Sequence, residues 1–119
     1  MEQKYIADDL VRYIGVNTPS VARVYEVREE CLILELTKDN CRWCLADYRE
    51  VEPIPLTLEV LTCNGWKWSD EHEEFSKHGV AIYPVGNYYR TDIFNMKIQY
   101  VHQLQHLLFG LGLNAELKV

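Results

Sequence analysis

The fold of this chain is decided by residues 98–110, which read IQYVHQLQHLLFG. When they are placed on a helix at about 100° per residue, the apolar side chains gather on one side. This apolar face comprises Val101, Leu104, Leu108 and Leu111, flanked by Tyr100 and Leu107. Gly110 is the residue type that commonly stops a helix. The stretch therefore predicts an amphipathic helix over residues 100–111, which packs its apolar face on a core.

The other side of this helix carries a different set of side chains. His102 and His106 lie one turn apart, and Phe109 extends the same stripe. Because the leucine face is expected to pack in the core, the side chains on the opposite side of the helix are not needed for core packing. We therefore expect His102, His106 and Phe109 to form a contact surface that faces solvent or a partner.

The first half of the chain predicts strands. Residues 21–28, 31–36 and 42–48 alternate or are rich in β-branched and aromatic side chains, and turn residues separate them. Residues 5–14 fit either a short helix or the beginning of a strand. We expect an N-terminal β-meander, or the same strands curled into a small barrel.

Two prolines, Pro53 and Pro55, mark the middle of the chain. They exclude a helix interior or a central strand, so we expect an extended linker there. After the linker, Thr57 suits the N-cap of a short helix, and the Asn-Gly pair at 64–65 ends it. The apolar face of this short helix would comprise Leu58, Val60 and Leu61.

The second half predicts an antiparallel sheet that precedes the C-terminal helix. Strand patterns cover residues 75–83, 88–91 and 94–100, and residues 115–119 could return as an edge strand. The fold class is therefore α+β. It combines an N-terminal β-meander or small barrel, a short middle helix, and an antiparallel sheet packed by the C-terminal amphipathic helix.

The composition is that of an acidic globular protein. The 119 residues carry a net charge of −6, and no run of basic residues occurs. Nucleic-acid binding normally needs clustered Lys and Arg, so the charge opposes that function. The length suits one domain, 1–119, and the alternative is two subdomains, 1–52 and 56–119, that meet at the prolines.

The cysteines and the absence of long apolar runs indicate in which cellular compartment the protein resides. There are four cysteines, Cys31, Cys41, Cys44 and Cys63, and no apolar run resembles a signal peptide or a membrane span. The simplest interpretation is a reducing environment with free, mostly buried thiols. We therefore expect a cytoplasmic protein.

Two pairs of side chains have the spacing of metal ligands, Cys41 with Cys44 and His102 with His106. Together they could make a composite zinc site. However, a Cys-x-x-Cys within a strand points its two thiols to opposite faces, whereas a zinc knuckle needs a turn. We therefore expect no metal or other cofactor, and we expect the cysteines to serve as small buried hydrophobic residues.

Aromatic side chains are dense in the second half, where they comprise Trp66, Trp68, Tyr83, Tyr88 and Tyr89. They could stack on single-stranded nucleic acid, but such platforms normally lie in a basic groove. We expect alternate members to fill the core instead. The alternative function is a nucleic-acid-binding small β-barrel, of the SH3-like or OB kind. It would need the arginines of the first half to converge on one face: Arg12, Arg23, Arg28, Arg42 and Arg49.

Two blocks of the sequence carry a family resemblance. Residues 53–66 and 98–105 resemble a family of small uncharacterised proteins from gut anaerobic bacteria and their phages or mobile elements. The resemblance covers residues 50–66 and 94–119 and is looser in the β-rich first half. It implies a cytoplasmic protein that a mobile element could encode, and it supplies no catalytic residue. His106 is a departure, because the family pattern favours Asn at that position.

No catalytic constellation stands out from the sequence, which has no G-x-S-x-G and no glycine-rich phosphate loop. We therefore expect a non-enzymatic accessory or interaction protein. It would bind an unknown protein partner or a second copy of itself through an exposed apolar or aromatic patch. The candidate surface residues are His102, His106, Phe109 and Trp68.

Overall fold

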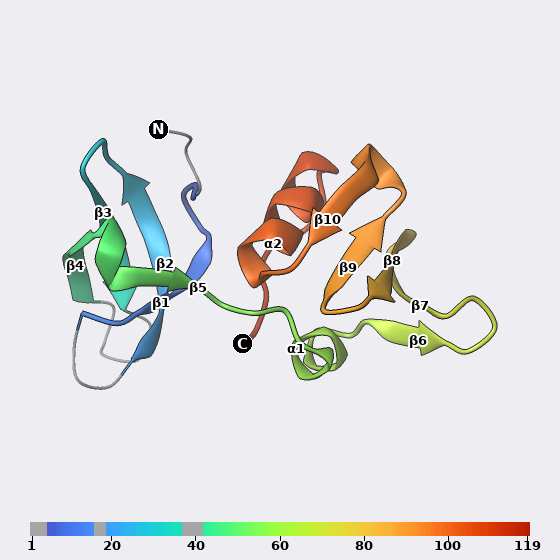
Figure 1. Cartoon of the computed structure of the whole chain (residues 1–119). Helices are drawn as coiled ribbons and strands as arrows, with labels where there is room; N and C mark the ends of the chain where they lie inside the picture. The colour runs from blue at the N-terminus through green and yellow to red at the C-terminus, as the bar shows by residue number, and fades with distance from the viewer. Residues whose placement is uncertain (1–4, 16–18, 37–41) are drawn as a thin grey trace.

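The computed structural model describes residues 5–15, 19–36 and 42–119. It has the predicted α+β architecture, with two antiparallel sheets of five strands each, one short helix and one C-terminal helix (Figure 1). The two sheets lie at opposite ends of a molecule that measures 45 × 28 × 26 Å. Within the described ranges, no helix is long and apolar enough to cross a membrane.

The first sheet contains β1 (Leu10–Tyr13), β2 (Ser20–Val27), β3 (Cys31–Leu36), β4 (Arg42–Asp47) and β5 (Val51–Pro53). The strands predicted over residues 21–28, 31–36 and 42–48 are confirmed. The strand order is β4-β3-β2-β1-β5, because β5 returns beside β1 after a 3-10 turn, η1 (Tyr48–Glu50). Since β5 returns beside β1, β4 and β5 lie at the two edges of this sheet. Pro53 lies on an edge strand, where its missing N–H donor is tolerated.

The second sheet is a meander of β6 (Lys67–Ser69), β7 (Glu74–Lys77), β8 (Val80–Val85), β9 (Tyr88–Thr91) and β10 (Met96–Ile98). The single strand expected over residues 75–83 is wrong, because a turn at His78 and Gly79 separates β7 from β8. Both turn residues have positive φ angles, 53° and 80°, which suit a tight turn and not a strand. The last strand is shorter than expected because a 3-10 turn, η2 (Ile93–Asn95), precedes it.

The middle helix, α1 (Leu58–Cys63), begins as predicted. The Oγ1 of Thr57 accepts a hydrogen bond from the backbone N–H of Val60 at 3.3 Å. Leu61 is fully buried, but Leu58 is 58% exposed, so the apolar face is narrower than the sequence suggests. At the end of α1, the side chain of Asn64 hydrogen-bonds to both the N–H and the C=O of Lys118. The C-terminal tail is held by such side chains, and the edge strand expected over residues 115–119 does not form.

The C-terminal helix, α2 (Val101–Gly110), has the predicted core face. Val101, Leu104 and Leu108 are at most 5% exposed. The start of the helix is fixed by Gln103, whose side-chain oxygen accepts hydrogen bonds from the backbone N–H groups of Gln99 and Tyr100. Because α2 contacts both β1 and β10, it lies between the two sheets (Figure 1).

Buried apolar side chains form two clusters. The first lies on the inner face of the first sheet and includes Val11, Val24 and Leu34. The second lies between α2 and the second sheet, and it also contains Leu10 from β1. Since Leu10 and Val11 are neighbours in one strand, they point to opposite faces. The first sheet therefore contributes side chains to both clusters: one of its faces packs in the first cluster, and the opposite face packs in the second.

Candidate functional site

The stripe on α2 opposite the leucine face is largely covered by the N-terminal segment. His102 is 2% exposed, and its ring meets the ring of Tyr5 edge-on at 5.1 Å. Burial, with a smaller effect from the charge of Asp9, raises the pKa of Tyr5 to about 12. The prediction that His102 belongs to an open surface is therefore wrong. Phe109, at 70% exposed, does remain accessible.

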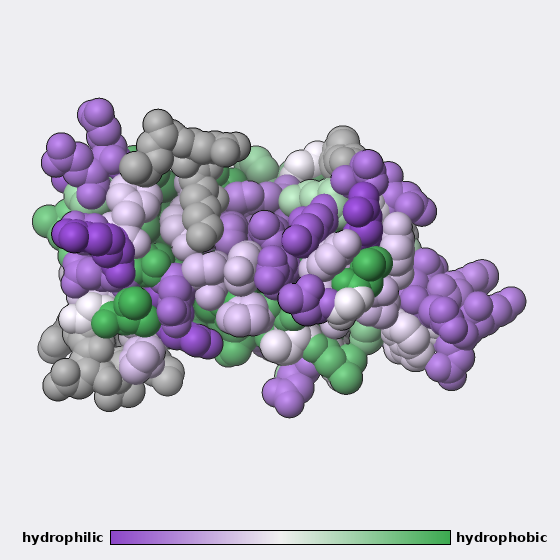
Figure 2. All heavy atoms as spheres, viewed as in Figure 1, coloured by the Kyte–Doolittle hydropathy of each residue, from purple (hydrophilic) through white to green (hydrophobic). Residues whose placement is uncertain are grey.

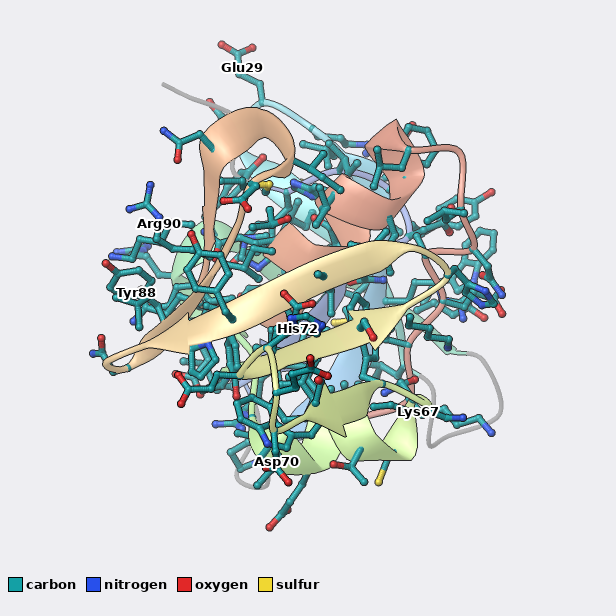
Figure 3. The ribbon with its side chains drawn as sticks, turned by 90° about the vertical axis from the view of Figure 1, so that its right-hand side faces the viewer. Glu29, Lys67, Asp70, His72, Tyr88 and Arg90 are labelled. Carbon is teal, nitrogen blue, oxygen red and sulfur yellow. The ribbon has the colours of Figure 1, made fainter. Side chains whose placement is uncertain are left out.

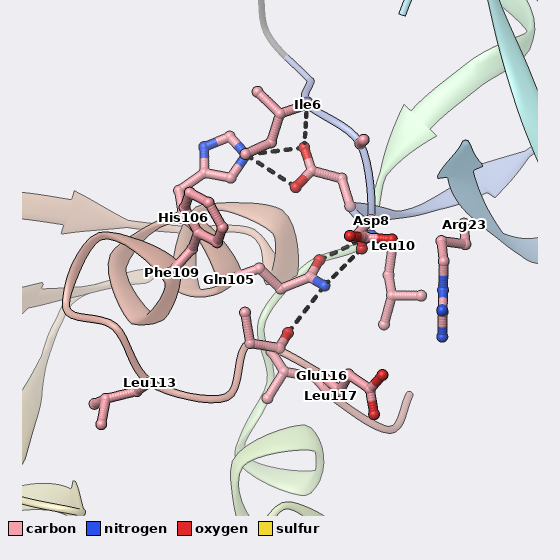
Figure 4. A pocket seen from close by; sticks show the side chains of 13 residues that line it. Ile6, Asp8, Leu10, Arg23, Gln105, His106, Phe109, Leu113, Glu116 and Leu117 are labelled. Atoms are coloured by element: carbon pink, nitrogen blue, oxygen red, sulfur yellow. Dashed lines mark hydrogen bonds and ion pairs between the residues drawn. The ribbon is translucent and has the colours of Figure 1, made fainter. Parts of the chain in front are cut away.

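A polar junction ties the same side of α2 to the segment before β1 (Figure 4). Asp9 is 1% exposed, and its two carboxylate oxygens lie 2.9 and 2.8 Å from Nε2 of His106. One of these oxygens also accepts a hydrogen bond from the backbone N–H of Ile6. A buried carboxylate needs such partners, because burial without them would be costly. His106 is thus part of the contact between the two halves.

Gln105 completes the junction (Figure 4). Its side-chain oxygen accepts a hydrogen bond from the backbone N–H of Leu10 at 2.8 Å. Its amide nitrogen donates to the backbone oxygens of Asp8 and Ala115, at 3.0 and 3.2 Å. The side chain of Gln105 therefore forms hydrogen bonds with backbone groups at the start of β1 and in the C-terminal tail. The sequence alone does not reveal this role of Gln105, because Asp8 and Leu10 lie 97 and 95 positions away in the chain.

A cleft of about 480 Å³ opens beside this junction. Its apolar wall includes Ile6, Phe109 and Leu113, and its charged lining consists of Asp8, Asp9, Arg23 and Glu116, with His106 beside them (Figure 4). The cleft has the size of a small-molecule site. However, charges of both signs line it and Gln105 is already fully hydrogen-bonded. The lining therefore singles out no ligand chemistry.

The two pairs with metal-ligand spacing form no metal-binding cluster in the part of the chain that the structure describes. Within residues 5–15, 19–36 and 42–119, no group of three or more potential ligating side chains converges. Cys41 lies outside the described residues. Cys44 pairs with Leu34 across β3 and β4, and Cys31, Cys44 and Cys63 are free thiols. The expectation that the cysteines are buried is wrong for these three, because Cys31 and Cys44 are half-buried and Cys63 is exposed.

An apolar face of the first sheet is open to solvent. It comprises Tyr25, Ile33, Trp43 and Leu45, which we call the open face. Trp43 and Leu45 are 61% and 65% exposed, and Leu45 lies directly opposite Ile33 in the β3–β4 ladder. The rings of Tyr25 and Trp43 stack with centroids 4.3 Å apart. Figure 2 shows hydrophobic and hydrophilic residues side by side at the surface over this sheet, whereas hydrophilic residues cover the β6–β7 hairpin at the other end.

In β4, the large apolar side chains face solvent and the small ones face the core, whereas burial of apolar surface would favour the opposite arrangement. The large residues are Trp43 and Leu45, and the small residues between and after them are Cys44 and Ala46. A hydrogen bond to Cys44, together with burial, raises the pKa of the inward-facing Tyr13 to about 12. Sequence reasoning missed the open face. The alternation of large and small residues in β4 shows that its two faces differ, but it does not show which face is inside.

The aromatic residues of the second half divide between the two faces of their sheet. Trp66 is buried, and Trp68 is 43% exposed at the sheet edge. Trp68 packs on Phe75 at 4.9 Å and donates a hydrogen bond from Nε1 to Asp70. Burial raises the pKa of Tyr89, which packs near Phe75. Trp68 is thus partly accessible, as expected for a surface residue, but neighbours already contact it.

The outer face of the second sheet is polar (Figure 3). Tyr88 and Arg90 occupy alternate positions of β9, so their side chains share this face. Lys97 lies over the ring of Tyr88, with its Nζ 4.5 Å from the centroid. Arg90 donates a hydrogen bond to the side chain of Asn95 at 2.7 Å.

Three of the five arginines singled out in the first half are each paired with a carboxylate. Arg12 pairs with Glu52, Arg28 with Glu26, and Arg49 with Asp47, at 3.1, 2.9 and 3.4 Å. Arg23 lines the cleft, and the side chain of Arg42 lies outside the described part. Among the arginines that the structure describes, no shared phosphate-binding face is therefore favoured.

Comparisons with models of protein families, with curated proteins and with solved structures give no match for this chain.

Proposed function

We propose that this chain is a non-enzymatic interaction protein that binds a protein partner through the open face. The observation that carries the proposal is the exposure of Trp43 and Leu45, at 61% and 65%, on alternate positions of one strand. Clustered, exposed apolar side chains on a small protein mark an interaction site. Trp and Tyr are also the residues that most often dominate the energy of protein interfaces.

The open face is already ordered for binding. The stacked rings of Tyr25 and Trp43 hold each other in place, so less side-chain freedom is lost when a partner covers them. Leu45 and Ile33 extend the same patch across two strands. This arrangement supports a preformed surface and not one created by a conformational change.

The setting of the protein is part of the same proposal. The free thiols of Cys31, Cys44 and Cys63 support a reducing, cytoplasmic location. The resemblance to small proteins of gut anaerobic bacteria and mobile elements supports an accessory role. The exposed Phe109 and Trp68 remain secondary candidates for contact.

Site-specific photo-crosslinking in the cells that produce the protein tests the proposal. Benzoylphenylalanine replaces Leu45 in one variant and Leu58 in a control, since both leucines are well exposed, at 65% and 58%. We expect a discrete adduct from position 45 that is absent from position 58. Equal labelling from the two positions, or no adduct from position 45, would overturn the proposal.

A second candidate is the binding of single-stranded nucleic acid on the outer face of the second sheet. The observation that favours it is the cluster of Tyr88, Arg90 and Lys97, with Lys97 over the tyrosine ring. Aromatic rings flanked by cations suit bases and phosphates. Fluorescence anisotropy with a labelled oligonucleotide at two salt concentrations tests it. Binding that weakens with salt and with Lys97→Glu would support it, and the absence of binding at low salt would remove it.

A further inference from the structure

The edges of the two sheets are not equally protected. Exposed edges carry unpaired backbone N–H and C=O groups that can pair with another chain, and proteins blunt them with short strands, Pro or Lys. Three of the four edge strands have these features. Each of the strands β5, β6 and β10 has three residues, and they contain Pro53, Lys67 and Lys97, respectively.

The fourth edge, β4, has none of this protection. It has six residues, RWCLAD, without Lys or Pro, and it pairs with β3 on one side only among the described strands. Figure 1 shows β4 at the outer end of the molecule, away from α2. The unprotected edge also carries the two most exposed members of the open face, Trp43 and Leu45.

We propose that β4 pairs antiparallel with β4 of a second copy of this chain, so that the two first sheets join across a two-fold axis. This inference rests on the proposed function and names the partner. Two identical partners related by a two-fold axis present the same surface to each other, which an antiparallel strand pair satisfies.

Self-complementarity of β4 favours a second copy over another extended chain. When Cys44 lies opposite Cys44 of the second copy, Trp43 lies opposite Leu45 of that copy, and Leu45 opposite its Trp43. Residues directly opposite in an antiparallel pair share a face, so the two open faces merge into one apolar patch.

Two-fold symmetry selects the antiparallel direction. A two-fold axis that crosses the middle of β4 at a right angle to the sheet reverses the direction of the second strand. A single added strand pair buries little area, so the dimer is weak and depends on concentration.

Sedimentation equilibrium of the purified full chain tests the pairing. The variant is Leu45→Lys, and the matched control is Leu58→Lys, which adds the same charge at a similarly exposed leucine on α1. We expect the wild-type chain and the control to shift from the 14.0 kDa monomer towards a dimer as concentration rises. The dissociation constant of Leu45→Lys should rise at least about tenfold, because an apolar side chain is lost from both halves of the interface.

Cross-linking provides a second readout that does not depend on Leu45. In a chain with Cys31, Cys41 and Cys63 replaced by Ser, only Cys44 remains. Opposite residues of an antiparallel pair lie close enough for a disulfide, so copper–phenanthroline oxidation should give a disulfide-linked dimer. The same chain carrying Leu45→Lys should cross-link far less.

The outcomes separate this inference from the proposed function. A strictly monomeric wild-type chain, or equal dimerisation of Leu45→Lys and Leu58→Lys, would overturn the pairing of two copies. If position 45 still cross-linked to a different protein in cells, the proposed function would stand with another partner. If position 45 gave no adduct at all, the proposed function itself would fall.

Discussion

The outer faces of the two sheets differ although both carry aromatic residues. On the second sheet, Tyr88 shares its outer face with Arg90 and Lys97, which keep that face hydrated. On the first sheet, Tyr25 and Trp43 stack on each other and share their face with Ile33 and Leu45, and Glu35 lies opposite Trp43 on that face. The difference teaches that aromatic content does not identify a contact surface. A contact surface is identified by two other features. These are the side chains that share a face with the aromatic residues, and whether another layer of the protein covers that face.

The helix α2 explains why only one of the sheets has an open apolar face. Its leucine side covers the second sheet, and its polar side receives the N-terminal segment through Gln105 and His106. Both sides of α2 are therefore covered, and none of the described elements covers the outer face of the first sheet at β3 and β4.

The largest expected loss of stability comes from a substitution in the buried core under α2, and not from one on the open face. Leu104→Ala, at a fully buried position of α2, should lower the free energy of unfolding by about 2–5 kcal/mol, since it leaves a cavity. Leu45→Ala, on the open face, should change it by less than about 0.5 kcal/mol. Urea denaturation of both variants measures the contrast. Similar losses for the two would mean that Leu45 is a folding residue and not a contact residue.

A smaller effect is expected at the polar side of α2. Gln105→Leu removes the partners of three backbone groups, those of Leu10, Asp8 and Ala115. We expect a loss of about 1–3 kcal/mol, because buried polar groups are left unsatisfied. Gln99→Leu is the control, since the hydrogen bonds found in the described residues use only its backbone. Equal stability of the two variants in urea denaturation would show that the junction does not hold the halves together.

The smallest effect concerns pH and the ring that covers His102. The pKa of Tyr5 is raised to about 12 in the folded state, chiefly by burial, against about 10 in an unfolded chain. The folded state thus binds this proton more tightly, so its contribution to stability is complete below pH 10 and is lost as the pH rises through 12. Tyr5→Phe should flatten this alkaline decline, as measured by urea denaturation at a series of pH values. Tyr25→Phe, at an exposed ring, serves as the control, and an identical decline in both variants would contradict the account.

The leucine face of α2 could be predicted because helical periodicity is local. The N-cap at Thr57 and most strands of the first sheet could be predicted for the same reason. The burial of His102 and the pairing of His106 with Asp9 could not be predicted. Asp9 lies 97 positions before His106 in the sequence, so no local pattern connects the two. Nothing in the pattern of a single helix shows that a second layer will cover its polar side.

The open face could not be predicted because alternation shows that a strand has two faces but not which one is inside. For β4, the usual rule would bury Trp43 and Leu45, and the structure buries the side of Cys44 and Ala46. The inner face already receives Leu32 and Leu34 from β3, so small residues suffice beside them. The outcome depends on packing between strands and not on the strand itself.

Amide hydrogen exchange along the chain, followed as the protein concentration rises, tests the central claim most directly. The account predicts that exchange slows in β4 and around Tyr25, whereas the edge strands β6 and β10 keep the same rates. Slower exchange at β6, at β10 or around Phe109, or no change in β4 at any concentration, would contradict the claim that the open edge of the first sheet is where this protein associates.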